Sequence, residues 1–220
     1  MSTTLGVWAV CDIVEEHIEV LRHRRKLPPA EFVAARVPGP ENSPVPQEGE
    51  VVVLSEHFAR GLGLPASKFL YDFLTHYGLQ PHHLAPNAML HLAVFVALYK
   101  DFLRIDSRLD LWSWLFFFKQ SSAKYPATEG FFYVKNLDPT GDHVNVPAFF
   151  DAPPVERPNW KAELPSAAEE VNELCGRLEH MFTVEGLTAV DLLDAMVSHQ
   201  IEPLGYRLHL ICQMSGRHEP

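Results

Sequence analysis

The 220-residue sequence carries a formal net charge of −10, with 47% hydrophobic and 21% charged residues. This composition is typical of a globular protein and excludes a disordered or collagen-like chain. The acidic charge repels phosphate backbones, which disfavours general nucleic-acid binding but leaves room for a local basic face. The three cysteines lie far apart, so we expect no disulfide framework and a reducing compartment.

The N-terminus lacks a basic region, and its apolar run covers only residues 5–11. A membrane span needs about 20 apolar residues, and no such run occurs in the sequence. We therefore expect no signal peptide and no membrane partner. The expected location is intracellular, in the nucleus or the cytoplasm.

The first predicted helix covers residues 12–26, where apolar residues recur at helical spacing. Its acidic residues come early and its basic residues late, an order that complements the helix dipole. Two prolines then end the helix. The proline-rich residues 28–49 predict an extended connector rather than an element of secondary structure.

Residues 50–54 are β-branched and predict a brief strand, or a buried lead-in to a helix that Ser55 caps. Short helices separated by glycine follow. They are predicted over residues 57–60, 67–77, 86–102 and 110–118. Gly78 falls just past the second of these helices, a position that glycine favours.

The middle of the third helix, residues 88–99, is apolar on every side except at His91. A helix that is apolar all round must be covered all round, so we expect it at the centre of the fold. In that setting His91 is a core histidine with a satisfied ring rather than a ligand or a base.

The remaining chain is irregular between residues 121 and 164, apart from a strand-like run at 131–134. Two final helices are predicted over 166–182 and 188–197, and the second opens with a capping box made by Thr188 and Asp191. Four of its side chains are expected to point inward: Leu192, Leu193, Met196 and Val197.

Together these elements predict a mainly α fold, a single-domain helical bundle around a central buried helix with a small β element. We expect one domain overall. An N-terminal helix in residues 1–27 and a proline-rich connector in 28–49 precede a helical core domain in 50–220, against which the first helix packs.

Residues 61–105 read GLGLPASKFLYDFLTHYGLQPHHLAPNAMLHLAVFVALYKDFLRI and hold an ordered series of short motifs. The main positions are Gly61-Leu62-Gly63-Leu64-Pro65, Phe69, Tyr77-Gly78-Leu79, His83-Leu84, Pro86-Asn87, Phe95 and Phe102. These motifs resemble a plant family known as "putative gypsy-type transposon", or putative transposase domain. Similar patterns extend the resemblance to residues 24–29, 46–53, 132–134, 201–204 and 215–216.

The resemblance carries no catalytic residues over to this chain, because the family has no established ones. Relatives often insert a glycine-rich, strand-like piece where this chain has only residues 119–131. They also often continue into long coiled coils. The resemblance therefore implies a transposable-element lineage rather than a reaction.

A transposase or integrase needs three carboxylates that converge on two divalent metal ions. The candidates are Asp101, Asp106, Asp110 and Glu202, and none ends a convincing core strand. The histidines His57, His76, His82 and His83 lack the spacing of a zinc motif. Cys175 falls on an apolar helical face, where a thiol acts as a small hydrophobe. We expect no catalytic residues, no metal and no cofactor.

The basic run contains Arg22, Arg24, Arg25 and Lys26. It can be interpreted as a nuclear import signal or a phosphate-contacting edge, which would bind nucleic acid. The dipole argument favours a simpler interpretation, in which these cations stabilise a helix C-terminus.

An aromatic belt includes Trp112, Trp114, Phe117 and Phe118. Such residues are core residues by default, but a short helix has little surface to bury so many rings. Part of the belt is therefore a candidate interaction or dimer face.

The leading functional hypothesis is a non-enzymatic protein-interaction module of a plant protein derived from a transposable element. Such a module has a protein partner or self-associates. The alternative is a nucleic-acid-binding component of a retrotransposon-related protein, and a weaker one is a metal-dependent transposase or nuclease.

Overall fold

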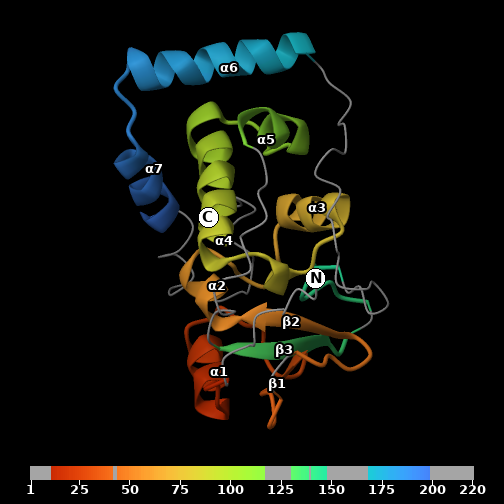
Figure 1. Ribbon diagram of the computed structural model, residues 1–220. Coiled ribbons are helices and arrows are strands. Elements are labelled where there is room, and N and C mark those ends of the chain that lie inside the picture. Colours follow the sequence, from red (N-terminus) through yellow and green to blue (C-terminus); the bar gives the residue numbers. More distant parts are fainter. Residues whose placement is uncertain (1–10, 42–43, 117–129, 139, 148–167, 199–220) are drawn as a thin grey trace, which may run out of the picture.

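The computed structural model describes residues 11–41, 44–116, 130–138, 140–147 and 168–198. A three-stranded antiparallel sheet forms one end of the molecule, with strand order β1-β3-β2 (Figure 1). The strands are β1 (Val33–Arg36), β2 (Glu50–Leu54) and β3 (Phe131–Asn136). The central strand β3 pairs Val134 with Ala35 of β1 and with Val51 of β2.

Both faces of the sheet are buried, which explains its continuous β-branched and aromatic runs. On one face, Val51, Val53, Phe132 and Val134 join the main hydrophobic core. The opposite face holds a second cluster of Val52, Leu54, Phe131 and Tyr133. The two sets alternate along the strands because successive side chains of a strand point to opposite faces.

One ion pair joins all three strands across the second face. The guanidinium of Arg36 on β1 lies 3.9 Å from the centroid of the Tyr133 ring on β3. It reaches past that ring to Glu50 on β2, with N–O distances of 2.8 and 2.7 Å. This two-pronged pairing, which is favoured by the planar guanidinium, holds the pKa of Glu50 below its usual value.

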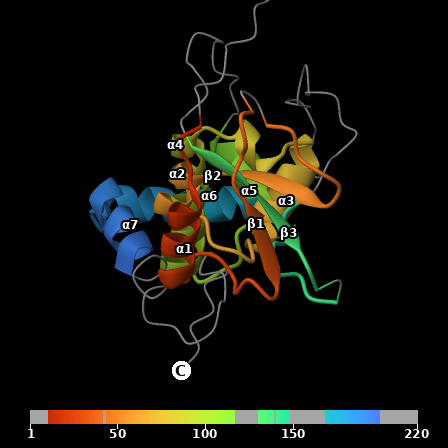
Figure 2. The ribbon, with the colours of Figure 1, turned by 90° about the horizontal axis from the view of Figure 1, so that it is seen from below.

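The described helices extend from the sheet to the far end of the molecule, except that the first lies beside the sheet and the last turns back alongside the central helix (Figure 1). They are α1 (Glu15–His23), α2 (Ser55–Ala59), α3 (Lys68–Tyr77), α4 (Pro86–Ala97), α5 (Leu109–Leu115), α6 (Ala168–Thr183) and α7 (Ala189–Met196). A 3-10 turn at Pro81–His83 precedes α4, and a π-helical segment at Leu98–Leu103 continues it. Helix α4 runs from the sheet end toward α6, and α3 and α7 lie on opposite sides of it (Figures 1 and 2).

Aromatic rings fill the space between α3, α4 and α5. The ring of Trp112 meets Phe95 edge to face at 5.1 Å between centroids, and meets Phe73 in the same way at 5.6 Å. Edge-to-face contacts suit the quadrupoles of aromatic rings. The rings of the α5 segment therefore fasten α5 to the central helix.

Gly61 lets the end of α2 approach α4 closely. Its φ of +97° is in the region that favours glycine, and a Cβ added there would lie 2.7 Å from Cβ of Ala93. The neighbouring Leu62 and Leu64 are buried. The Gly-Leu-Gly-Leu-Pro motif is thus a packing element between α2 and the central helix.

Several local predictions are confirmed. Residues 50–54 form a strand, and α3 matches the helix expected at 67–77, except that Ser67 caps it by accepting a hydrogen bond from the Leu70 amide. Gly78 ends α3 in the left-handed conformation. Thr188 and Asp191 form the predicted capping box of α7.

The prediction of a mainly α helical bundle with a small β element is wrong, because the fold is mixed α and β. The sheet is a full layer, since residues 33–36 add a third strand from the segment expected to be a connector. This strand is four residues long and lies between prolines, so its composition resembled that of a loop. The domain division itself stays a prediction.

Helix α4 is central but is not covered all round. His91 and Asn87 are exposed, and Leu90 and Val94 are only half-buried. These four residues recur at spacings of three and four, so they share one side of the helix. The interpretation of His91 as a core histidine is therefore wrong.

Candidate interaction surface

Two cations of the basic run bind main-chain oxygens inside the protein. The Arg22 guanidinium donates to the Val33 oxygen over 2.9 Å and also to the Pro28 oxygen. The Lys26 ammonium donates to the Phe58 oxygen, and burial lowers the pKa of this lysine. Their charge therefore fixes the end of α1 to β1 and α2.

The other two cations differ in exposure. Arg25 is half-buried and has a positive φ of 55°, whereas Arg24 is exposed. Neighbouring His23 is exposed too. Of the four cations in the run, Arg24 is therefore the one exposed to solvent. The role of the run in nucleic-acid binding or nuclear import stays a prediction.

The aromatic candidates divide between the core and the part outside the described residues. Trp112 is 5% exposed and packs in the core, while the adjacent Phe116 is 40% exposed. Trp114 lies on α5, but its side chain is outside the described part of the structure, as are Phe117 and Phe118. An interaction face at the aromatic belt therefore stays a prediction.

The buried histidines serve the packing of the loop before α4. His57 is fully buried, with its Nε2 2.9 Å from the Leu84 oxygen, and burial lowers its pKa to about 4. Burial also lowers the pKa of His82 to about 3, helped by the neighbouring His83 and His57. Both rings are thus neutral at neutral pH. His83 accepts a hydrogen bond from the Gln80 amide and so closes the 3-10 turn.

The acidic candidates do not converge where the structure describes them. Asp110 binds Arg108, while Asp106 is largely exposed and lies 3.7 Å from Lys100. Glu202 lies outside the described residues. Within the described ranges, no group of three histidine, cysteine, aspartate or glutamate side chains is placed to hold a metal ion.

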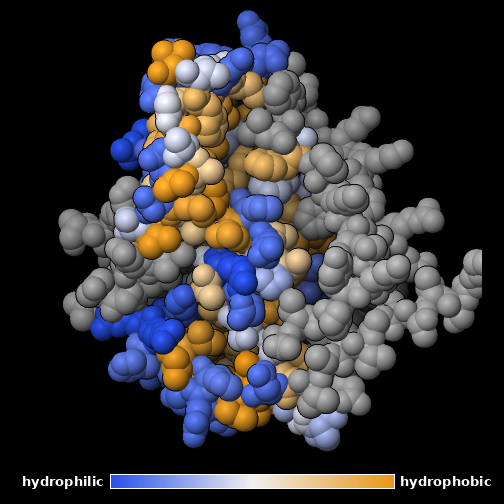
Figure 3. Space-filling view, turned by 60° about the vertical axis from the view of Figure 1, so that its left-hand side comes forward, coloured by the Kyte–Doolittle hydropathy of each residue, from blue (hydrophilic) through white to orange (hydrophobic). Residues whose placement is uncertain are grey.

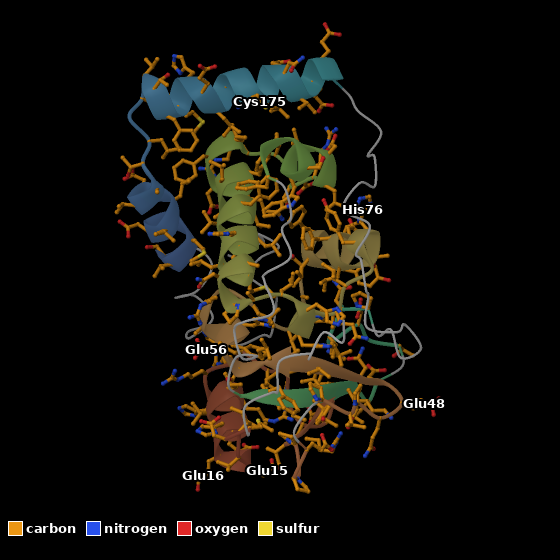
Figure 4. All side chains as sticks on the ribbon, viewed as in Figure 1. Glu15, Glu16, Glu48, Glu56, His76 and Cys175 are labelled. Carbon is orange, nitrogen blue, oxygen red and sulfur yellow. The ribbon has the colours of Figure 1, made fainter. Side chains whose placement is uncertain are left out.

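Other potentially reactive groups are also dispersed. Glu56, His76 and Cys175 come from α2, α3 and α6 and lie apart from one another (Figure 4). Cys175 packs against the core, and burial raises the pKa of its thiol. A raised pKa keeps the thiol protonated and so makes it a poor nucleophile.

The last two described helices carry a cluster of exposed apolar side chains. We call this cluster the α6–α7 patch, and it consists of Phe182, Val184, Val190, Leu193 and Val197. Figure 3 shows apolar surface gathered on this side of the molecule, beside strongly hydrophilic atoms. The exposed fraction reaches 69% at Val184 and 63% at Val190.

Helix geometry explains why α7 has two apolar stripes. Leu192 and Met196 are buried toward α4, against which α7 packs. Val190, Leu193 and Val197 recur at spacings of three and four residues, so they share a different side of the helix. Because α7 touches the body of the protein along one stripe only, the other stripe faces solvent.

Acidic residues flank the patch along the sequence. Residues 168–198 hold seven acidic residues and one arginine. The four acidic residues that border the patch in sequence are Glu179, Glu185, Asp191 and Asp194. Hydrogen bonds from Thr188 lower the pKa of Asp191, so its carboxylate stays charged while it caps the helix.

Sequence reasoning missed this patch. Leu193 and Val197 were predicted to point inward, and both are exposed, so that prediction is wrong. The signal was available in the width of the apolar arc of α7, which is greater than a single packed face needs. Of the acidic residues beside it, only Asp191 was singled out from the sequence, as part of the capping box.

The family comparison concerns a different part of the chain. Residues 51–120 match the family model described as "Putative gypsy type transposon". This span is a transposon-related domain segment. It begins in β2 and includes α2, α3, α4, α5 and the Gly61 packing element, which confirms the resemblance to the gypsy-type transposon family within residues 51–120.

The transposon-related segment contains the central helix but not α6 or α7, so the α6–α7 patch lies outside it. No curated protein and no solved structure matches the chain. Among the helices of the described residues, none has the length and apolar character needed to cross a membrane.

Proposed function

We propose that this chain is a non-enzymatic protein-interaction module of a plant protein derived from a transposable element. The α6–α7 patch is its docking surface. One observation carries the proposal: of the eleven exposed large hydrophobic side chains in the described structure, five lie within residues 182–197. Exposed apolar side chains scattered singly need no explanation, whereas a cluster favours a binding site.

Covering such side chains is favourable in water. Each Å² of apolar surface removed from water contributes about 25 cal/mol, so a few large side chains at the centre of an interface contribute several kcal/mol. The patch combines one aromatic ring, that of Phe182, with four aliphatic side chains. The transposon-related segment then acts as the scaffold that holds α6 and α7 in place. We expect this association in the nucleus or the cytoplasm.

The chemistry of the described side chains supports a role without catalysis. The buried His57 ring and the half-buried His82 ring are neutral, and Asp110 is paired with Arg108. Each of these groups has a structural task that accounts for its position. The family description keeps nucleic-acid binding as the alternative, and Arg24 is its best remaining contact.

The test compares two double variants of the full chain. Val190→Ser/Leu193→Ser removes two exposed apolar side chains from the patch. Val14→Ser/Val20→Ser removes two exposed valines, one at the N-cap of α1 and one within it. Light scattering measures self-association, and affinity capture from plant tissue measures binding of other proteins. The proposal expects the patch variant to lose the association and the α1 variant to keep it.

The same samples address the alternatives. Equal association of both variants, or association of neither protein with anything, would contradict the proposal. Retention on DNA that weakens steeply with salt and with Arg24→Glu would support the nucleic-acid alternative instead. Strand cleavage that depends on a divalent metal ion would support the enzyme alternative.

A further inference from the structure

Resting on the proposed function, we infer that the α6–α7 patch binds a basic amphipathic helix of another protein. The inference joins two features of the surface, its apolar stripe and its acidic border. The stripe determines the kind of element that fits. The border determines the charge that this element carries.

The apolar stripe of α7 has helical spacing. Val190, Leu193 and Val197 span two turns, a length of about 10 Å at 1.5 Å per residue. Phe182 and Val184, at the end of α6 and just after it, extend the apolar surface beyond α7. An amphipathic helix laid against this surface would present apolar side chains at matching intervals of three and four residues.

One residue of the acidic border has a close partner within the same segment, because Oε1 of Glu185 lies 3.1 Å from Nδ1 of His180. The one arginine of residues 168–198, Arg177, directs its guanidinium to the Leu103 oxygen at 3.5 Å. Glu170 pairs with Arg108, but it lies at the opposite end of α6 from the patch. Seven acidic residues and one arginine give these 31 residues a net charge of −6 (1 − 7), against −10 for the whole chain.

This charge discriminates between occupants. A second copy of the chain would bring its own acidic border against the first, and like charges placed together oppose association. Anionic lipid and nucleic-acid phosphates would be repelled in the same way. Lysine or arginine residues that flank an apolar helix face would instead complement the border.

The experiment uses two synthetic amphipathic helices of about 18 residues, long enough to form several turns. Both carry the same leucine face. One has lysine and the other glutamate at every polar position. Fluorescence anisotropy with the full chain at about 50 mM NaCl is expected to show the lysine peptide binding at least about tenfold more tightly, and the difference is expected to shrink at about 500 mM NaCl.

Variants separate specific docking from general attraction to an acidic protein. Val190→Ser/Leu193→Ser keeps every charge, so it is expected to lose binding of the lysine peptide only if the patch is the site. Glu185→Lys/Asp194→Lys keeps the apolar stripe and changes the net charge of residues 168–198 from −6 to −2 (3 − 5), so it is expected to shrink the preference for the lysine peptide. Unchanged binding by the Val190→Ser/Leu193→Ser variant would overturn the inference.

Two further outcomes distinguish this inference from the proposed function. Equal binding of both peptides, lost in Val190→Ser/Leu193→Ser, would overturn the charge preference and leave the docking surface intact. Self-association that depends on Val190 and Leu193, with no binding of either peptide, would show a second copy as the occupant. Circular dichroism of each variant checks that the fold is retained, as expected for exposed positions.

Discussion

The guanidinium of Arg22 donates a hydrogen bond to the main-chain oxygen of Val33 over 2.9 Å. This bond joins the last turn of α1 to the first residue of β1, which is the edge strand that makes the sheet a full layer. The side chain of Arg22 is only 14% exposed. Arg22, a candidate nucleic-acid contact by sequence, therefore stabilises the protein's own fold.

Replacing Arg22 tests this role directly. Arg22→Ala leaves the Val33 and Pro28 oxygens without their donor, and we expect the free energy of unfolding to fall by about 1 to 3 kcal/mol. Arg24→Ala removes an exposed cation two residues away and is expected to change it by less than about 0.5 kcal/mol. Urea unfolding followed by circular dichroism measures both changes in unfolding free energy. Equal changes for the two variants would contradict the structural role of Arg22.

Gly61→Ala tests the close approach of α2 to α4. The added methyl group would lie 2.7 Å from Cβ of Ala93, at a φ of +97° that disfavours alanine. We expect a loss of about 1 to 3 kcal/mol in the free energy of unfolding. Gly176→Ala in α6 is the matched control, because nothing lies within 4 Å of the new atom and helical alanine is favoured. Equal or greater stability of Gly61→Ala would contradict the packing described for this motif.

The buried histidines make the fold sensitive to mild acid. The pKa of His57 is about 4 in the folded protein, below its ordinary 6.5, and the pKa of His82 is shifted in the same direction to about 3. Between these values and 6.5 the unfolded chain binds more protons than the folded one, so stability is retained above pH 6.5 and falls as the pH drops below it. At about pH 5 the loss from His57 alone is about 2 kcal/mol.

Unfolding by urea at about pH 7.5 and about pH 5 measures this loss. His57→Leu removes one titrating ring and is expected to narrow the difference between the two pH values. His23→Gln removes an exposed histidine and is expected to leave the difference unchanged. The quantity compared is the difference in unfolding free energy between the two pH values, taken for each variant separately. A lower overall stability of His57→Leu therefore does not affect the result. An unchanged difference in His57→Leu would contradict the assigned burial.

Local elements were predictable where one short signal determines them. The β-branched residues 50–54 formed a strand. Helix α3 began next to Ser67 and ended at Gly78, as expected. The third strand was not predictable, because β1 depends on partners about one hundred residues away in β3 and on the bond from Arg22. The exposure of His91 likewise depends on how many neighbours α4 has, which its own apolar character does not reveal.

The candidate surface was less predictable than the fold. Residues 22–26 were a candidate surface because of their positive charge. In the folded protein, however, Arg22 and Lys26 donate hydrogen bonds to internal main-chain oxygens. Leu193 and Val197 were predicted as ordinary core positions of an amphipathic helix. Only the placement of α7 against α4 along one stripe shows that these side chains reach solvent.

Site-specific photo-crosslinking in plant cells tests the docking surface most directly. A photoreactive side chain replaces Val190 in one copy of the chain and Val14, the exposed residue just before α1, in another. The proposed function predicts covalent adducts with a protein from position 190, suppressed by Leu193→Ser, and few or none from position 14. Adducts of equal yield from both positions, or none from position 190 while the folded protein is present, would contradict it.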